Sequence, residues 1–447
     1  VAPGTIAAVG TGTAAAATLD AGSNSAFRVS VASNDLLNVT GNLDVPGAHT
    51  LTVIPSGDIP QNSIFTVIDY GTATAGSYAN VNVVGSTPRL NLVKEPDDGS
   101  TIKVKVTGFD AMIWKGNDGT NPTLWDVNTT TNWLTSFSNV AGKFLANDVV
   151  IFDDSAAEFN VALTGTIDPV STTFNNDAND YTLSGDPITT GSLTKNSLAK
   201  VTLTNNNTYP GPTVINDGTL QIGNGTSGSI AAGSAVTVGS ELILNLAAGG
   251  TYANATSGSG GLITIIGTGN MTFNPVIPAQ VLPAVTSSIS LDFNRDGTVY
   301  CNSQNQTTGS VTINDGIVAF DGSQQGNRLA VNKTVTVNAN GTMAILGVNA
   351  LPTAANSVNV NLVGGTLAIM TGGSNATGAT GQSHAHVRDV TMNGGTMVLD
   401  YSGTGTAYNG ESVQLNNTLF VVGTSPSSIN YGMNATLATT GLSLNGN

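Results

Sequence analysis

A short phrase that returns at a nearly fixed interval constrains the fold of this chain more than any other feature of its sequence. Each copy places β-branched residues at alternate positions, then a glycine, then a small residue and an apolar one. The copies cover residues 214–220, 311–318, 335–343, 358–367 and 390–399, with a looser one at 236–242. From Gly316 the glycine returns after 25, 24 and 30 residues, and the 98 residues from Gly218 to Gly316 correspond to four such steps. A return in the twenties is the length of one turn of a β-solenoid.

The alternation inside each copy indicates how such a turn is built. Alternate residues of a strand point to opposite faces, so the Val, Ile and Leu positions predict an inward apolar face and the Thr and Asn positions an outward polar one. Glycine tolerates the backbone of a corner, and we expect Gly365 at one corner, with Met343 and Leu367 entering the core. A β-sandwich also uses Gly-Thr turns, but it does not require one phrase to return at this interval. We therefore predict an all-β chain that folds as a right-handed parallel β-helix, a β-solenoid with irregular rungs.

The charge balance excludes several classes of partner. Lys and Arg number 13 and Asp and Glu number 28, a net charge of −15, whereas binding to nucleic acids or anionic membranes needs a basic surface. The sequence contains no apolar run of about 18 residues, so we expect no membrane insertion. Cys301 is the single cysteine, which excludes an intrachain disulfide and leaves packing to stabilise the fold. Charged residues make up only 9% of the chain, and this profile predicts an extracellular or cell-surface protein.

Changes in composition predict three parts. Residues 1–110 are interpreted as closing β-solenoid rungs that end in cap-like strands, where charge collects. Within them, residues 101–106 alternate apolar and cationic side chains, which suits an exposed edge strand. Residues 111–155 form a junction that holds all three tryptophans, and residues 156–447 carry the repetitive parallel β-helix.

One segment resembles a known family. Leu193-Thr194-Lys195 is followed by Val201-Thr202-Leu203, by Asn207-Thr208-Tyr209 with Gly211, and by Gly218-Thr219-Leu220. This order is similar to the autotransporter-associated β-strand repeat, also called the passenger-associated repeat. Departures are the prolines on both sides of Gly211, and Asn196-Ser197 where a glycine usually follows the lysine. The resemblance implies a large bacterial surface or secreted protein that is β-helical, non-enzymatic, and serves as a passenger stalk or surface fibre.

The order of the three parts leads to a hypothesis about assembly. Residues 1–110 look like the closing half of one solenoid and residues 111–447 like the opening half of another. The sequence ends at residues 444–447 without a charged cap, and unpaired strand edges attract another chain. We hypothesise that copies associate head to tail into a fibre, a heterologous contact that does not close on itself. The alternative is that the sequence is a fragment of a longer protein.

Two further segments contain residues that could bind metals. Asp292, Asn294 and Asp296 place oxygen ligands at the alternate positions of a calcium loop, and a glycine follows for the sharp turn. The twelfth position would be Ser303 instead of a bidentate glutamate, so these residues fit a solenoid corner as well as calcium, the one cofactor that the sequence suggests. A His384-Ala385-His386 pair has no third metal ligand beside it, and an exposed loop explains it equally.

The tryptophans allow two interpretations. Trp114, Trp125 and Trp133 could form a glycan-stacking platform, or they could plug the hydrophobic core at the start of a solenoid. The repeats carry single Asp residues instead of the paired carboxylates of a glycoside hydrolase, so we expect no enzyme. The leading hypothesis is an extracellular structural protein, a subunit of a bacterial surface stalk, sheath or filament. The alternative is an adhesin passenger that binds glycans or surfaces, and a polysaccharide-degrading enzyme is disfavoured.

Overall fold

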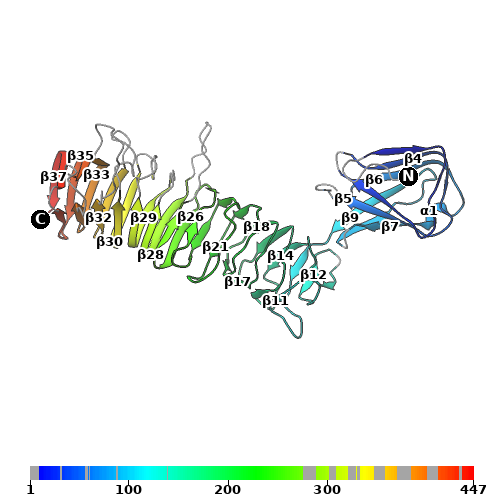
Figure 1. The fold of residues 1–447 in the computed structure, drawn as a ribbon, viewed down its shortest axis with the longest axis horizontal. Coiled ribbons are helices and arrows are strands. Elements are labelled where there is room, and N and C mark those ends of the chain that lie inside the picture. The colour runs from blue at the N-terminus through cyan, green and yellow to red at the C-terminus, as the bar shows by residue number, and fades with distance from the viewer. Residues whose placement is uncertain are drawn as a thin grey trace. The chain divides into compact units, whose positions relative to one another are not determined.

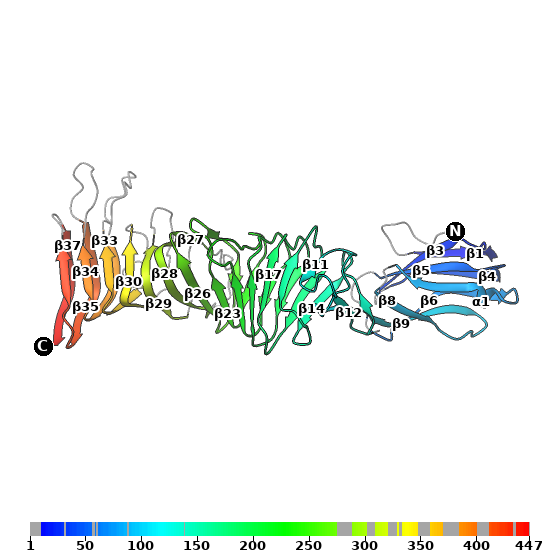
Figure 2. The same ribbon diagram turned by 90° about the horizontal axis from the view of Figure 1, so that it is seen from below.

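The computed structural model consists almost entirely of short β-strands in the residues that it describes (Figures 1 and 2). The described residues are 10–30, 33–55, 59, 61–86, 89–137, 139–274, 288–301, 309–320, 329, 333–346, 358–369, 384–399, 411–431 and 435–446. The chain divides into a smaller unit, Val1–Met112 with Leu134–Ala141, and a larger unit, Ile113–Trp133 with Gly142–Asn447. In the described ranges we find no helix with the length and hydropathy of a membrane span.

The smaller unit is a stack of parallel strands in two sheets. One sheet has the order β1 (Thr11–Ala14), β4 (Leu36–Asp44) and β6 (Ile64–Ala73), and the other has β3 (Asn24–Val29), β5 (His49–Pro55) and β7 (Val81–Gly85). β2 (Ala17–Thr18) pairs with β4, and α1 (Ser77–Asn80) is a single helical turn before β7. Alternation along the strands buries Phe27, Leu37 and Leu51 almost completely in the core of this unit.

Antiparallel strands end the parallel stack of the smaller unit. β9 (Thr101–Phe109) pairs antiparallel with β6 on one side and with β8 (Leu90–Lys94) on the other. The prediction that residues 101–106 form an exposed edge strand is therefore wrong, because β9 has a neighbour on each side. The alternation did identify the faces: Ile102, Val104 and Val106 are fully buried, while the lysines between them are partly exposed. Alternation fixes which face a side chain takes, but it does not fix how many strands lie beside its own.

The larger unit begins as two series of parallel strands that alternate along the chain. The first sheet has the order β10 (Met112–Trp114), β14 (Val149–Asp153), β16 (Ser171–Asn175), β18 (Ser192–Lys195), β20 (Thr213–Ile215), β22 (Val236–Val238) and β25 (Thr256–Ser257). The second has β11 (Leu124–Trp125), β15 (Asn160–Leu163), β17 (Tyr181–Gly185), β19 (Lys200–Leu203), β21 (Thr219–Ile222), β23 (Glu241–Leu244) and β26 (Leu262–Thr268). Each circuit of the chain, called a rung here, contributes one strand to each sheet. This arrangement confirms the predicted parallel β-solenoid.

Later rungs of the larger unit use longer strands in the second sheet. They are β28 (Ser290–Cys301), β29 (Val311–Phe320) and β30 (Thr334–Ile345), then β31 (Val358–Val363), β32 (Thr366–Ile369), β33 (His384–Asn393), β34 (Thr396–Leu399), β35 (Glu411–Gly423), β36 (Ser428–Tyr431) and β37 (Ala435–Gly446). Short strands complete the set: β12 (Trp133–Thr135), β13 (Ala141–Gly142), β24 (Thr251–Tyr252) and β27 (Met271–Phe273). Met343 and Leu367 are in register and fully buried, as predicted. A Cβ on Gly365 would lie 2.5 Å from the Asn338 carbonyl oxygen, which is why only glycine fits at that corner.

The strand register also corrects the length of the rungs. Thr219 pairs with Glu241, Glu241 with Leu262, and Leu262 with Ser290, and one further rung leads to β29. The segment from Gly218 to Gly316 thus contains the four steps that the sequence indicates, but they are unequal, because loops of different length leave the same stack of strands. Steps of 24 to 25 residues follow one another from β29 to β30 and from β30 to β31 and β32.

Candidate functional site

The segment that carries the family resemblance, residues 193–222, builds two successive rungs: β18 and β19 form one, and β20 and β21 form the next. Leu193, Leu203 and Leu220 point into the core and are almost fully buried. Lys195 points inward with them and has no exposed surface, with its Nζ 3.5 Å from the carbonyl oxygen of Asp217. Burial lowers the pKa of Lys195, and nearby aspartates, Asp217 first among them, oppose this shift.

Two asparagines fix the corner that follows β19. Both are almost completely buried, and Asn205 donates from Nδ2 to the Asp186 carbonyl oxygen at 2.9 Å. Asn207 accepts at Oδ1 from the backbone amide of Ile188 at 2.9 Å and from Asn205 at 2.9 Å. These amides supply the partners that buried backbone groups of the preceding rung would otherwise lack. The asparagines of the motif therefore act as connectors between rungs.

The tyrosine of the motif continues this buried polar network. The hydroxyl of Tyr209 lies 2.9 Å from Thr213 Oγ1, which lies 3.1 Å from Ser234 Oγ on the next rung. Burial raises the pKa of Tyr209. Tyr252 and Thr256 repeat the arrangement at 2.8 Å. Sequence reasoning missed this second pair, although the same Tyr-to-Thr spacing of four residues could have found it.

A cluster of aromatic rings fills the core at the start of the larger unit. Its members are Trp114, Trp125, Trp133, Phe144 and Phe152, which we call the aromatic plug, and each is at most 1% exposed. Ring centroids are 5.1 Å apart for Trp114 and Trp133 and 5.3 Å apart for Trp125 and Trp133, in edge-to-face geometry. A sugar-stacking platform needs ring faces that are open to solvent, and these three tryptophans present none.

The three candidate calcium ligands lie along a strand. β28 runs through Asp292, Asn294 and Asp296 and pairs with β26 before it and β29 after it, so the segment does not wrap around a point as a calcium loop does. Asp292 accepts hydrogen bonds from Asn294 at 3.3 Å and from Asn314 at 2.7 Å, while Asp296 is exposed. Ser303 lies outside the described residues.

The histidine pair falls on β33, and the side chains of His384 and His386 lie outside the description. Within the described ranges, no three His, Cys, Asp or Glu side chains come together as a metal site requires.

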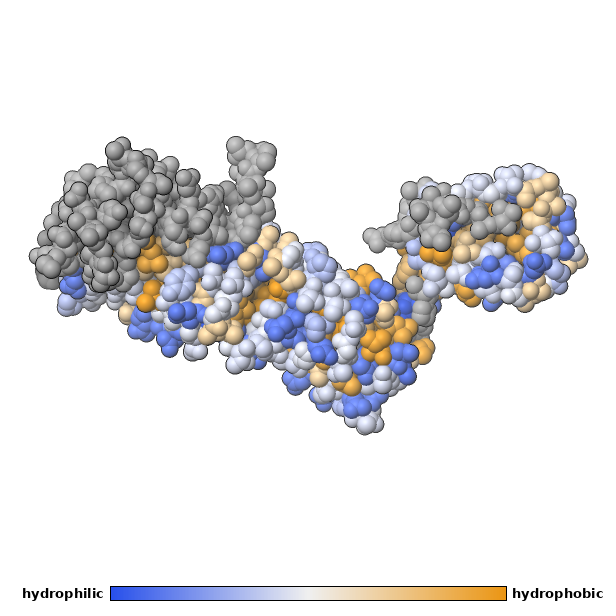
Figure 3. Space-filling model, in the orientation of Figure 1, coloured by the Kyte–Doolittle hydropathy of each residue, from blue (hydrophilic) through white to orange (hydrophobic). Residues whose placement is uncertain are grey.

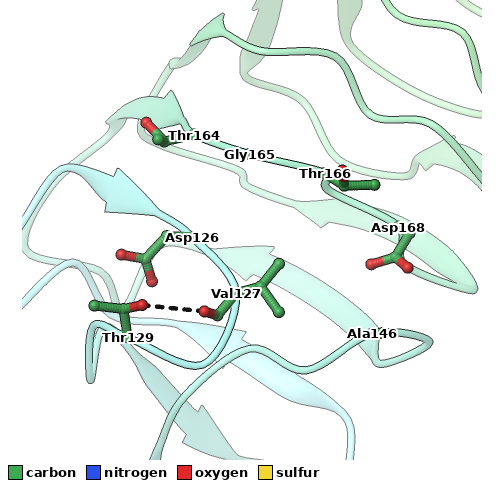
Figure 4. A pocket seen from close by; sticks show the side chains of 8 residues that line it. All are labelled: Asp126, Val127, Thr129, Ala146, Thr164, Gly165, Thr166 and Asp168. Atoms are coloured by element: carbon green, nitrogen blue, oxygen red, sulfur yellow. Dashed lines mark hydrogen bonds between the residues drawn. The ribbon is translucent and has the colours of Figure 1, made fainter.

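An open pocket of about 500 Å³ lies among turns of the larger unit (Figure 4). Its lining consists of Asp126, Val127, Thr129, Ala146, Thr164, Gly165, Thr166 and Asp168. Asp126 accepts hydrogen bonds at Oδ1 from the backbone and hydroxyl of Thr130, whereas Asp168 Oδ1 is buried without a donor. The pocket offers carboxylates and hydroxyls, and its lining contains no cationic or imidazole group. No sequence pattern marked these residues, because the turns that hold them come from different rungs.

Comparison with known proteins supports the family resemblance of residues 193–222. The family model of the passenger-associated-transport-repeat matches residues 193–222. No curated protein and no solved structure matched the chain. The matched residues are those whose leucines, asparagines and tyrosine connect successive rungs. This chain therefore carries a passenger-associated-transport-repeat and is consistent with autotransporter-associated repeat proteins, whose passenger repeats imply a secreted or surface-exposed protein.

Proposed function

We propose that this chain is a non-enzymatic structural protein, a subunit of a bacterial surface stalk or filament whose copies associate end to end. The observation that carries the proposal is the position of two closures. The antiparallel strands β8 and β9 close the stack of the smaller unit, and the aromatic plug closes that of the larger unit.

Both closures lie near each other in the sequence, between residues 90 and 152. A parallel rung cannot continue past an antiparallel hairpin without a change of direction, and a plug of five large rings leaves no core for another rung to share. Each stack can therefore be extended only at the end away from its closure. In the proposal, a second copy supplies the extending rung.

The outer surface supports a structural role as well. Asn196 donates to Asn175 Oδ1 at 3.0 Å, and Asn216 donates to Asn196 Oδ1 at 2.8 Å, so one exposed ladder connects three rungs. Glu241 accepts from Thr219 at 2.8 Å and from Thr264 at 3.0 Å and connects the rungs on either side of it. Figure 3 shows polar residues over much of the visible described surface, with smaller hydrophobic patches between them. Hydrogen bonds among neutral side chains are insensitive to salt, which suits a protein in a variable external medium.

Negative-stain electron microscopy of the purified native chain tests the proposal. We expect long fibres of uniform width, and particles that stay short and monodisperse at high concentration would contradict it. Thr13→Lys places a charge on β1, the end strand of its sheet among the described strands, whereas Thr40→Lys places one on β4, which has a strand on each side. Because lysine on an edge strand blocks edge-to-edge pairing, Thr13→Lys should shorten the fibres and Thr40→Lys should not.

A second candidate function is that of a glycan- or surface-binding adhesin passenger. The observation that favours it is the open pocket, because its lining combines the carboxylate of Asp168 with three threonines, groups that hydrogen-bond to sugar hydroxyls. A glycan array probed with the full chain and with Asp168→Asn tests this function. Binding that the substitution abolishes would support the adhesin, and the absence of binding in both would remove it.

A further inference from the structure

Among the described residues of the long-strand rungs, Arg295 is the most deeply buried cationic group, with 1% of its surface exposed. Its guanidinium donates to four backbone carbonyl oxygens: Nε to Gly269 at 2.6 Å, Nη1 to Ile266 at 2.7 Å, and Nη2 to Thr268 at 2.6 Å and Leu246 at 3.0 Å. None of these hydrogen bonds goes to a carboxylate. Arg295 remains charged when buried, because the guanidinium does not lose its proton in proteins. The four carbonyl dipoles therefore take the place of water around the cation.

The carbonyl groups come from two successive passes of the chain, and the arginine comes from a third. Leu246 follows β23, the carbonyl groups of Ile266 and Thr268 lie at the end of β26 with that of Gly269 just after it, and Arg295 lies on β28. Gly267 pairs with Arg295 across the sheet. A single side chain thus connects three rungs through their backbones. The residues that flank it, Asn294 and Asp296, are two of the three candidate calcium ligands, and the cation that the structure places between them is the side chain of Arg295.

This connection coincides with a change in the cross-section of the solenoid. β25 is the last strand of the first sheet, and β28 is the first strand of the larger unit with ten or more residues. The register also changes here: Asn294 pairs with Asp315 and Thr298 with Ile317, so three residues of β28 are opposed by one residue of β29. Such a bulge weakens the ladder between β28 and β29, on the side of β28 away from the four carbonyl groups.

We propose that the carbonyl oxygens of Leu246, Ile266, Thr268 and Gly269 form a binding cage for a guanidinium cation, which Arg295 fills. The cage joins the short-strand rungs and the long-strand rungs of the larger unit into one cooperative structure. Without the cation, four acceptors would be buried without donors in the rungs next to β28, whose ladder to β29 is already interrupted.

The absence of a side chain at Gly267 leaves the space that the guanidinium of Arg295 occupies. A Cβ at this position would lie 2.8 Å from Arg295 Nη1 and 2.6 Å from Asn245 Oδ1. Gly260 has a similar left-handed backbone, φ +78° against +105°, but no atom lies within 4 Å of its Cβ position. Both Gly→Ala variants carry backbone strain, and only Gly267→Ala also presses on the guanidinium. We expect Gly267→Ala to lower the melting temperature more than Gly260→Ala.

Chemical rescue of Arg295→Ala in the full chain tests the cage directly. Thermal unfolding is followed by circular dichroism and by limited proteolysis, with millimolar guanidinium chloride or with sodium chloride at equal ionic strength. We expect the variant to unfold in an additional, earlier step, about 10 °C or more below the wild type, that removes the long-strand rungs. Guanidinium chloride should raise the temperature of that earlier unfolding step, and sodium chloride should not. Arg388→Ala, which removes an exposed arginine of β33, serves as the control and should respond to neither salt.

An Arg295→Ala chain that unfolds like the wild type, or that guanidinium does not stabilise, would overturn the proposal. If this variant fails to fold in both salts, Arg295→Lys and Arg295→Met decide the matter by their refolding yields. The lysine variant retains a cation that three carbonyls can accept, so it should refold better than the methionine variant. Equal yields would show that only the volume of the side chain matters.

Discussion

At the scale of single residues, buried hydroxyls explain why the repeat motif ends in a tyrosine. Tyr209, Thr213 and Ser234 share hydrogen bonds across two rungs. Tyr209→Phe removes one partner while Thr213 keeps the other, so we expect a loss of about 0.5–1.5 kcal/mol in the free energy of unfolding. Thr213→Val leaves both neighbours with fewer partners and should cost more, about 1–3 kcal/mol. Urea denaturation of the two variants measures the difference, and equal losses would contradict the network.

The raised pKa of Tyr70 leads to a prediction of how the stability of the smaller unit responds to alkaline pH. Burial, and then the adjacent Asp97 at 3.2 Å from its hydroxyl, raise the pKa of Tyr70 to about 12. The unfolded chain ionises this phenol near pH 10, so its contribution to stability is complete below pH 10 and is lost as the pH rises to about 12. We expect unfolding free energy to fall across this window. Tyr70→Phe should make the fall shallower, and an unchanged slope would contradict the shifted pKa.

At the scale of elements, the aromatic plug makes the start of the larger unit depend on a few rings. Trp133 contacts Trp114, Trp125, Phe144 and Phe152 at centroid distances of 5.1, 5.3, 6.0 and 5.6 Å. Trp133→Ala opens a cavity in this cluster, and we expect the unfolding free energy to fall by about 3–5 kcal/mol. Val170→Ala, at a residue that is 53% exposed, should change it by less than about 0.5 kcal/mol. Tryptophan fluorescence during denaturation reports both, and similar effects would argue against a plug.

Pairing between strands explains why β9 is not an edge strand and why residues 292–297 do not form a loop. β9 has the alternation of an edge strand, but β8 occupies its second edge. Residues 292–297 have the turn-forming composition of a loop, yet pairing with β26 and β29 extends them as part of β28. In both cases a neighbouring strand outweighs the local preference, because each ladder hydrogen bond satisfies a backbone group that would otherwise be buried without a partner.

At the scale of the whole molecule, the two units should unfold separately. The core of the smaller unit consists of residues between 19 and 106, and the plug and later rungs form the core of the larger one. Because each unit has its own core, we expect two calorimetric transitions. Ile102→Ala should lower the midpoint temperature of the transition of the smaller unit, and Trp133→Ala that of the larger unit. A single transition that both variants lower together would show that the units unfold as one.

The sequence by itself determined the architecture. The return of one phrase and the alternation within it predict a parallel β-solenoid, because each rung places the same residue types in register on the rung before it. The motif that runs from Leu-Thr-Lys to Gly-Thr-Leu likewise identified the passenger-associated repeat at residues 193–222. Such signals are readable because each rung contributes the same residue types at the same places.

Only the tertiary structure decided which neighbours individual residues and strands contact. It buries Trp114, Trp125 and Trp133 together, gives β9 a second neighbour, and surrounds Arg295 with four carbonyl groups. These outcomes depend on atoms that loops of unequal length bring together from different rungs. A periodic sequence specifies that rungs stack, but the identity of the neighbour across each rung is settled only when the register between them forms.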